Sequence, residues 1–143
     1  MKILKSVTIA ITFLICSTSY AQQVSERLLS ALATIESSNN PTAVGDNGKA
    51  IGIYQIHRVY WEDASQFDKT LKSGRYEDCV DPTYAARVVR AYMARYAPVG
   101  ASDEQLARIH NGGPKGHQRG STKGYWAKVV KELARRSSQQ LNS

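Results

Sequence analysis

The sequence predicts an α+β domain that is predominantly α, with one small β-hairpin lobe. Apolar residues recur at helical spacing in several separate segments, which indicates amphipathic helices. Between the first two of these segments lies a polar, turn-rich stretch, and the short β-branched run IGIYQI (51–56) follows it. A chain of 143 residues has the length of a single domain.

The first 21 residues have the pattern of a secretory signal peptide. Lys2 and Lys5 make a positive start, residues 7–15 form a short apolar run, and small residues precede Gln22. We therefore expect cleavage before Gln22, a mature domain over residues 22–143, and no stable membrane insertion afterwards. The protein is then secreted or periplasmic. A short membrane anchor is the alternative interpretation of the same run.

The mature domain is expected to be basic and to hold one cysteine. The formal charge of the whole chain is +7, and loss of Lys2 and Lys5 lowers it to +5. A basic exported protein suits anionic partners such as cell-wall polymers, nucleic acid or lipid headgroups. Without a recognition motif or a dense basic run, nucleic acid is disfavoured. Cys79 has no cysteine to pair with and is expected to be a buried, inert thiol.

The N-terminal part predicts one helix and the β lobe. The helix is expected from Ser25 to Glu36. The polar stretch after it contains Asp46-Asn47-Gly48, a strong tight-turn signal. IGIYQI is then expected to be a strand that leads into a helix near residues 57–64. A small hairpin or irregular β lobe over residues 42–56 follows from the turn and the strand.

Three more helices are expected in the C-terminal half. One begins at Asp81-Pro82, an N-cap followed by proline, and should be the central buried helix. The next begins at Ser102, where Gln105 completes a capping box, and it ends at the sequence NGGP (111–114). The last carries an apolar stripe, and the tail over residues 137–143 is expected to fray. That stripe comprises Tyr125, Trp126, Val129, Val130 and Leu133.

Glu36 is the first candidate catalytic residue because of its spacing. Leu28, Leu32 and Glu36 are four residues apart and share one helix face. The leucines must face the core, so Glu36 is expected at the edge of the core, where the helix stops. Desolvation there disfavours a charged carboxylate, and a carboxyl that keeps its proton can act as a general acid. A solvated glutamate, or one paired with an arginine, is the alternative.

Asp46 is the second candidate, ten residues further along the chain. A carboxylate in a polar turn is solvated and is expected to stay ionised. Two carboxyl groups in contrasting environments can divide the work of glycoside cleavage between them. One protonates the leaving oxygen, and the other stabilises or attacks the sugar cation, or activates water. Taken alone, Asp46 is better explained as a turn-forming residue.

Several stretches resemble a known family. ESSNNPTAVGDNGKAIGIYQI (36–56) is similar to the catalytic segment of lysozymes and lytic transglycosylases, in which a glutamate ends a helix. YWEDA (60–64), AYMARY (91–96), ARIHNGGPKG (107–116) and GYW (124–126) resemble the invertebrate-type lysozymes, the destabilase family. The resemblance covers most of residues 30–130. Animal members are rich in disulfides, so the single mature cysteine suggests a bacterial branch.

The resemblance implies a lysozyme-like fold and cleavage of peptidoglycan glycan strands. It places Glu36 as the general acid, and Asp46 is the best match for the second carboxylate, although the loop length differs from that of familiar members. It also implies that Tyr54 and Gln55 line the sugar cleft. The Gln55 amide can donate and accept hydrogen bonds, which suits an acetamido group. Ser37 is expected to hydrogen-bond near the site or simply to end the helix.

Four further candidates lie in the C-terminal half. The resemblance makes His110, Asn111 and Gly112 cleft residues, at a helix end where glycine lets the backbone approach a ligand closely. The structural alternative is a helix stop with His110 packed beneath it. Tyr125 resembles the tyrosine near the catalytic glutamate of lysozyme-like folds and is a candidate hydroxyl donor to Glu36. Core packing is its alternative role.

These expectations combine into a muramidase that cuts the β-1,4 bond between N-acetylmuramic acid and N-acetylglucosamine. No metal-ligand cluster is recognisable in the sequence, so no metal or other cofactor is expected. Peptidoglycan is the expected partner, and a lysozyme-inhibitor protein or a secretion or conjugation machine are further candidates. A lytic transglycosylase that uses Glu36 alone and a non-catalytic cell-wall-binding module are the alternatives.

Overall fold

The structure is a computed structural model that describes residues 24–141, so the predicted signal peptide lies outside the described range. Helices dominate the described part and a small three-stranded antiparallel sheet completes it, which confirms the predicted fold class. No helix within residues 24–141 has the length and apolar character needed to cross a membrane.

The helices are α1 (Glu26–Ser37), α2 (Arg58–Phe67), α3 (Pro82–Tyr96), α4 (Asp103–Gly112) and α5 (Lys123–Leu141). The strands are β1 (Val44–Gly45), β2 (Ala50–Ile51) and β3 (Ile56–His57). Short 3-10 turns are η1 (Asp46–Gly48), η2 (Lys69–Ser73), η3 (Tyr76–Val80), η4 (Gly116–Gln118) and η5 (Gly120–Thr122).

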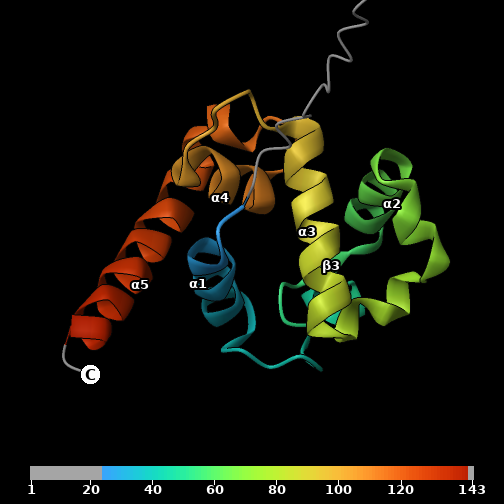
Figure 1. Cartoon of the computed structure of the whole chain (residues 1–143), viewed down its shortest axis with the longest axis horizontal. Coiled ribbons are helices and arrows are strands. Elements are labelled where there is room, and N and C mark those ends of the chain that lie inside the picture. Colours follow the sequence, from blue (N-terminus) through green and yellow to red (C-terminus); the bar gives the residue numbers. More distant parts are fainter. Residues whose placement is uncertain (1–23, 142–143) are drawn as a thin grey trace, which may run out of the picture.

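Helix α3 is the central element, as predicted. In Figure 1 it runs through the middle of the molecule, with α2 on one side and α1, α4 and α5 on the other. Asp81 caps its first turn by accepting a hydrogen bond from the Tyr84 N–H, and Pro82 occupies the first helical position. Its buried face supplies Ala85, Val88, Val89, Ala91, Tyr92 and Met93 to the core.

The caps of α1 and α4 also agree with the sequence to within one residue. The Ser25 hydroxyl accepts a hydrogen bond from the Leu28 N–H, which starts α1. The chain leaves this helix through Ser38, which has a left-handed φ of 53°. At α4, Ser102 and Gln105 form the expected capping box. These caps place Glu36 in the last turn of α1 and His110 in the last turn of α4.

The prediction of a single strand at IGIYQI is wrong. Strand β2 ends at Ile51, β3 starts at Ile56, and residues 52–55 form the turn between them. Gly52 and Gln55 have φ values of 78° and 49°, in the left-handed region that strands exclude. A Cβ on Gly52 would lie only 2.1 Å from the carbonyl oxygen of Cys79. The segment turns here and packs closely against η3. The strand propensity of its isoleucines does not prevent this turn.

The tail that was expected to fray is helical in the part that the structure describes. Helix α5 continues to Leu141, while residues 142–143 lie outside the described range. Contacts with α1 hold its end: Arg27 donates to the Ser137 hydroxyl (3.0 Å), and Arg136 donates to the carbonyl of Ser30 (3.0 Å). Val130 does not belong to the apolar stripe; its exposed fraction is 45%, because it points about 100° away from buried Val129.

Cys79 is a buried free thiol, as predicted. Burial raises the pKa of this thiol to about 12, and the nearby charges of Asp78 and Glu77 act in the same direction. The reactive thiolate is therefore scarce at neutral pH. Cys79 fills space in the core and is not available as a nucleophile.

Candidate active site

A pocket of about 310 Å³ lies where the ends of α1 and α4 meet the β lobe. Both predicted carboxylates contribute to its wall, together with three of the predicted binding residues. A larger hollow of about 560 Å³, between α1 and α5, contains none of the predicted site residues. The smaller pocket is lined by Glu36, Gly45, Asp46, Gln55, His57, Tyr60, His110 and Asn111.

Glu36 lies at the edge of the core, as its spacing predicts, with 19% of its side chain exposed. The Tyr125 hydroxyl donates to its Oε1 at 2.6 Å, so the predicted contact between these two residues is confirmed. Burial raises the pKa of Tyr125 well above its ordinary value, and the charge of Glu36 raises it further. The phenol therefore stays protonated and acts as a permanent donor to the carboxyl group.

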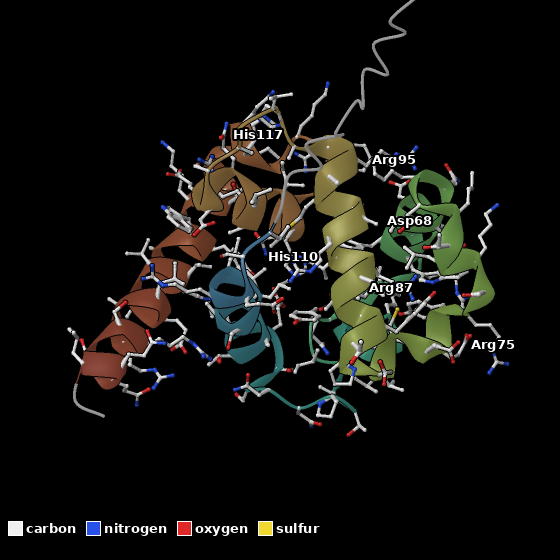
Figure 2. All side chains as sticks on the ribbon, in the orientation of Figure 1. Asp68, Arg75, Arg87, Arg95, His110 and His117 are labelled. Carbon is white, nitrogen blue, oxygen red and sulfur yellow. The ribbon has the colours of Figure 1, made fainter. Side chains whose placement is uncertain are left out.

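His110, in the last turn of α4, lies between the ribbons of α1 and α3 in Figure 2. Its Nδ1 is 3.0 Å from the Tyr60 hydroxyl, and its Nε2 is 3.6 Å from Glu36 Oε1, beyond hydrogen-bonding distance. Burial raises the pKa of the Tyr60 phenol, so Tyr60 keeps its proton. The His110 ring also forms a hydrogen bond with the backbone of Tyr54. Tyr60 itself is stacked on Tyr92 in the core, with ring centroids 3.6 Å apart.

Because His110 is buried, we expect it to make the protein less stable in acid. Burial lowers the pKa of His110, an effect that the charge of Glu36 and the bond to Tyr54 only partly oppose. The unfolded chain therefore takes up a proton near pH 6.5 that the folded protein binds only at lower pH. Stability is full above that value, and it falls as the pH drops through it, by at most about 1.4 kcal/mol per pH unit.

Denaturant unfolding at pH 5 to 8 measures this effect. The His110→Gln variant should lose part of the acid slope, whatever its absolute stability, because glutamine does not titrate in this range. The matched control, His117→Gln, should retain the slope, since His110 is intact. If the slope of stability against pH were unchanged in His110→Gln, His110 would not be the source of the acid sensitivity.

Asp46 faces the pocket from η1, with 68% of its side chain exposed. Its Oδ2 lies 2.8 Å from Nε2 of His57, on β3. Asp46 lies in a tight turn, as predicted. Its contact with His57 was not predicted. The two residues are eleven apart in sequence and meet only through the pairing of three strands. Local sequence patterns contain no signal for that register.

The remaining predicted residues divide between the pocket and its supports. Gln55 lines the pocket while its amide donates to the carbonyl of Gly52 at 2.9 Å. Ser37 does not line it: its hydroxyl donates to the carbonyl of Ile53 at 2.9 Å and joins α1 to the turn between β2 and β3. Tyr54 is only 7% exposed and packs in the core.

Gly112 follows Asn111 at the end of α4 and is not part of the pocket wall. A Cβ at this position would lie 2.5 Å from Thr122 Cγ2, so the glycine allows the segment after α4 to pack closely. Substrate binding by these residues and by Tyr125 stays a prediction. Within residues 24–141, no group of three or more His, Cys, Asp or Glu side chains is arranged to hold a metal ion.

Residues 25–132 match the family model described as Destabilase. A lysozyme of Meretrix lusoria is 38% identical over 114 residues, which cover 76% of this chain and 89% of the relative. Lysozyme 1 of Crassostrea virginica is 36% identical over 112 residues; the match spans 74% of this chain but only 58% of that relative. The crystal structure of Aeromonas hydrophila PliI in complex with the Meretrix lusoria lysozyme contains a chain of similar fold. Its TM-score is 0.65 at 35% identity, covering 76% of this chain and 89% of that one.

Proposed function

The chain belongs to the destabilase family of invertebrate-type lysozymes, and from this premise we propose that it is a glycoside hydrolase acting on peptidoglycan. The specific reaction proposed is that of a muramidase, which cleaves the β-1,4 bond between N-acetylmuramic acid and N-acetylglucosamine. The observation that carries the proposal is the meeting of Glu36 and Asp46 at one pocket, in contrasting environments. Relatives that carry the name lysozyme support it independently.

In this mechanism Glu36 is the general acid. It gives its proton to the glycosidic oxygen as the bond from that oxygen to the sugar C1 breaks. Tyr125 holds the carboxyl group in one orientation through its 2.6 Å hydrogen bond. Only 19% of the Glu36 side chain is exposed, so the carboxyl group faces the pocket from the edge of the core.

Asp46 is the second carboxylate. It stabilises or captures the positive charge that develops at C1, or it positions the water whose oxygen ends on that carbon. It reaches the pocket from η1, where 68% of its side chain is exposed. Gln55 and Asn111 offer amide groups in the same pocket, which suit the acetamido groups of the sugars. The reaction needs no cofactor.

The products of digestion test the proposal against its nearest alternative. A lytic transglycosylase uses one glutamate and lets the muramic acid's own hydroxyl close an anhydro ring, whereas a hydrolase adds water. The second carboxylate at the pocket favours hydrolysis. Mass spectrometry of wall fragments should therefore find reducing ends 18 Da heavier than anhydro ends, the mass of one water. Anhydro products would contradict hydrolysis, and wall binding without loss of turbidity would contradict catalysis.

We also propose that the protein acts outside the cytoplasm, as the predicted signal peptide requires, in the periplasm or after secretion. A protein inhibitor is a second proposed partner, because the similar Meretrix lusoria lysozyme is bound by PliI in a crystal structure. A secretion or conjugation machine that needs a local opening in the wall is a third. The basic charge of the chain suits the anionic wall that all of these settings share.

A further inference from the structure

The exposed carboxylate of Asp46 has one neighbour that the proposed mechanism does not yet use. His57 Nε2 lies 2.8 Å from Asp46 Oδ2, and both side chains line the pocket that contains Glu36. The other carboxylate oxygen, Oδ1, has no hydrogen-bond partner among residues 24–141. The contact thus engages one oxygen of Asp46 and leaves the other for a ligand in the pocket.

The two partners differ in how firmly the fold holds them. Asp46 begins a 3-10 turn with a φ of 47°, and Asn47 follows with a φ of 55°, a conformation that non-glycine residues seldom adopt. With 68% of its side chain exposed, Asp46 would sample several rotamers if nothing held it. Catalysis by a carboxylate depends on its being held close to the productive geometry.

His57, by contrast, belongs to regular structure on both sides. Its backbone is paired with Ala50 in the sheet, and it is the residue from which α2 starts. Ala50 is also paired with Gly45, the residue before Asp46. The register therefore places Gly45, Ala50 and His57 in one row across the sheet. The His57 imidazole extends along this row to reach Asp46 in η1.

The chemistry of the contact is independent of the charge on the ring. A carboxylate only accepts hydrogen bonds, so Nε2 must carry a proton in both the neutral and the charged imidazole. Arg58, the next residue along the chain, is already engaged: it binds Glu77 at 2.8 Å and lies over the ring of Tyr76. Nδ1 of His57 has no hydrogen-bond partner within the described range.

We propose that His57 is a positioning residue for Asp46, donating Nε2–H so that the second carboxylate is held at the pocket in the orientation needed for catalysis. This inference rests on the proposed function of Asp46. His57 need not touch the substrate or exchange a proton with it. Its contribution is to remove the rotamer freedom of a carboxylate that the turn alone leaves mobile.

Three substitutions at one position test the geometry. The glutamine amide nitrogen can take the place of Nε2, whereas that of asparagine is as close to the backbone as Nδ1 and cannot reach Asp46. His57→Ala and His57→Asn should lower kcat about tenfold on peptidoglycan fragments of uniform length, with KM changed less than about twofold. His57→Gln should recover kcat to within about threefold of the parent. Arg58→Ala is the matched control beside the site and should leave kcat unchanged.

A double-mutant cycle separates this inference from the proposed function. In an Asp46→Asn background, His57→Ala should have no further effect on kcat, because its target is gone. If Asp46→Asn lowers kcat while all three His57 variants match the parent, the positioning role is overturned and the role of Asp46 stands. If Asp46→Asn matches the parent, the proposed role of Asp46 is overturned, and the positioning role of His57 is overturned with it. Nitrogen NMR of the imidazole supplies a second readout: the neutral ring should be the Nε2–H tautomer in the parent, and Nδ1–H would contradict the proposal.

Discussion

Replacing Glu36 with glutamine is expected to lower kcat on peptidoglycan about a thousandfold, since general acid catalysis is typically worth two to four orders of magnitude. Glutamine has nearly the same shape as glutamate but carries no proton that it can give to a glycosidic oxygen. Its amide oxygen can still accept the hydrogen bond from Tyr125, so the contact at 2.6 Å has a substitute. The free energy of unfolding should therefore change by less than about 1 kcal/mol.

The control for this variant is Glu62→Gln, the same chemical change on an exposed residue of α2 outside the pocket. Turbidity loss of purified cell walls gives the rate, and denaturant unfolding gives the stability. The control should match the parent in both measurements. If Glu36→Gln cleared walls as fast as Glu62→Gln, Glu36 could not be the acid, and the proposed mechanism would be abandoned.

The second large effect is expected at Gly52, where alanine should cost about 4 kcal/mol of stability or prevent folding. The φ of 78° is unfavourable for any residue with a Cβ, by about 1–2 kcal/mol. Beyond that strain, the new Cβ would lie 2.1 Å from the backbone oxygen of Cys79 and 3.0 Å from its carbonyl carbon. Backbone atoms cannot swing aside as a flexible side chain can, so η3 and the turn must separate.

Gly48→Ala provides a matched comparison. Gly48 has a similar φ of 87°, but no atom lies within 4 Å of the position that a Cβ would take. The free energy of unfolding of this variant should fall only by the cost of backbone strain, about 1 kcal/mol. Unfolding both variants in urea isolates the contribution of the contact with Cys79. Equal losses at the two positions would mean that packing of the turn against η3 contributes nothing beyond backbone strain.

Much of the helical framework could be predicted because the signals are local. Asp81-Pro82 and the Ser102–Gln105 capping box each satisfy backbone groups within one turn, and the structure confirms both helix starts. The edge position of Glu36 follows from its four-residue spacing to buried Leu32. A helix face is a property of its own sequence once the core side is known.

Predictions that depend on distant partners were less successful. IGIYQI has the composition of a strand, yet its middle residues turn, because Gly52 packs against the backbone of η3. The polar C-terminal segment looks like a frayed tail, yet Arg27 on α1 contacts it and the helix continues. In both cases a residue far away in the chain decides the local conformation.

The sequence by itself determined the starts of α1, α3 and α4, the turn at Asp46 and the presence of a carboxyl group at the edge of the core. These features depend on backbone hydrogen bonding and side-chain periodicity within a few residues. The family resemblance anticipated the contact of Glu36 with Tyr125. Only the tertiary structure decided that Glu36 also lies beside His110, and that Asp46 meets His57 across three strands. The first two contacts require α1, α4 and α5 to pack together, and the last requires one strand register among several. The packing of these helices and the register of these strands depend on which surfaces are buried most favourably against one another. That is a property of the whole chain.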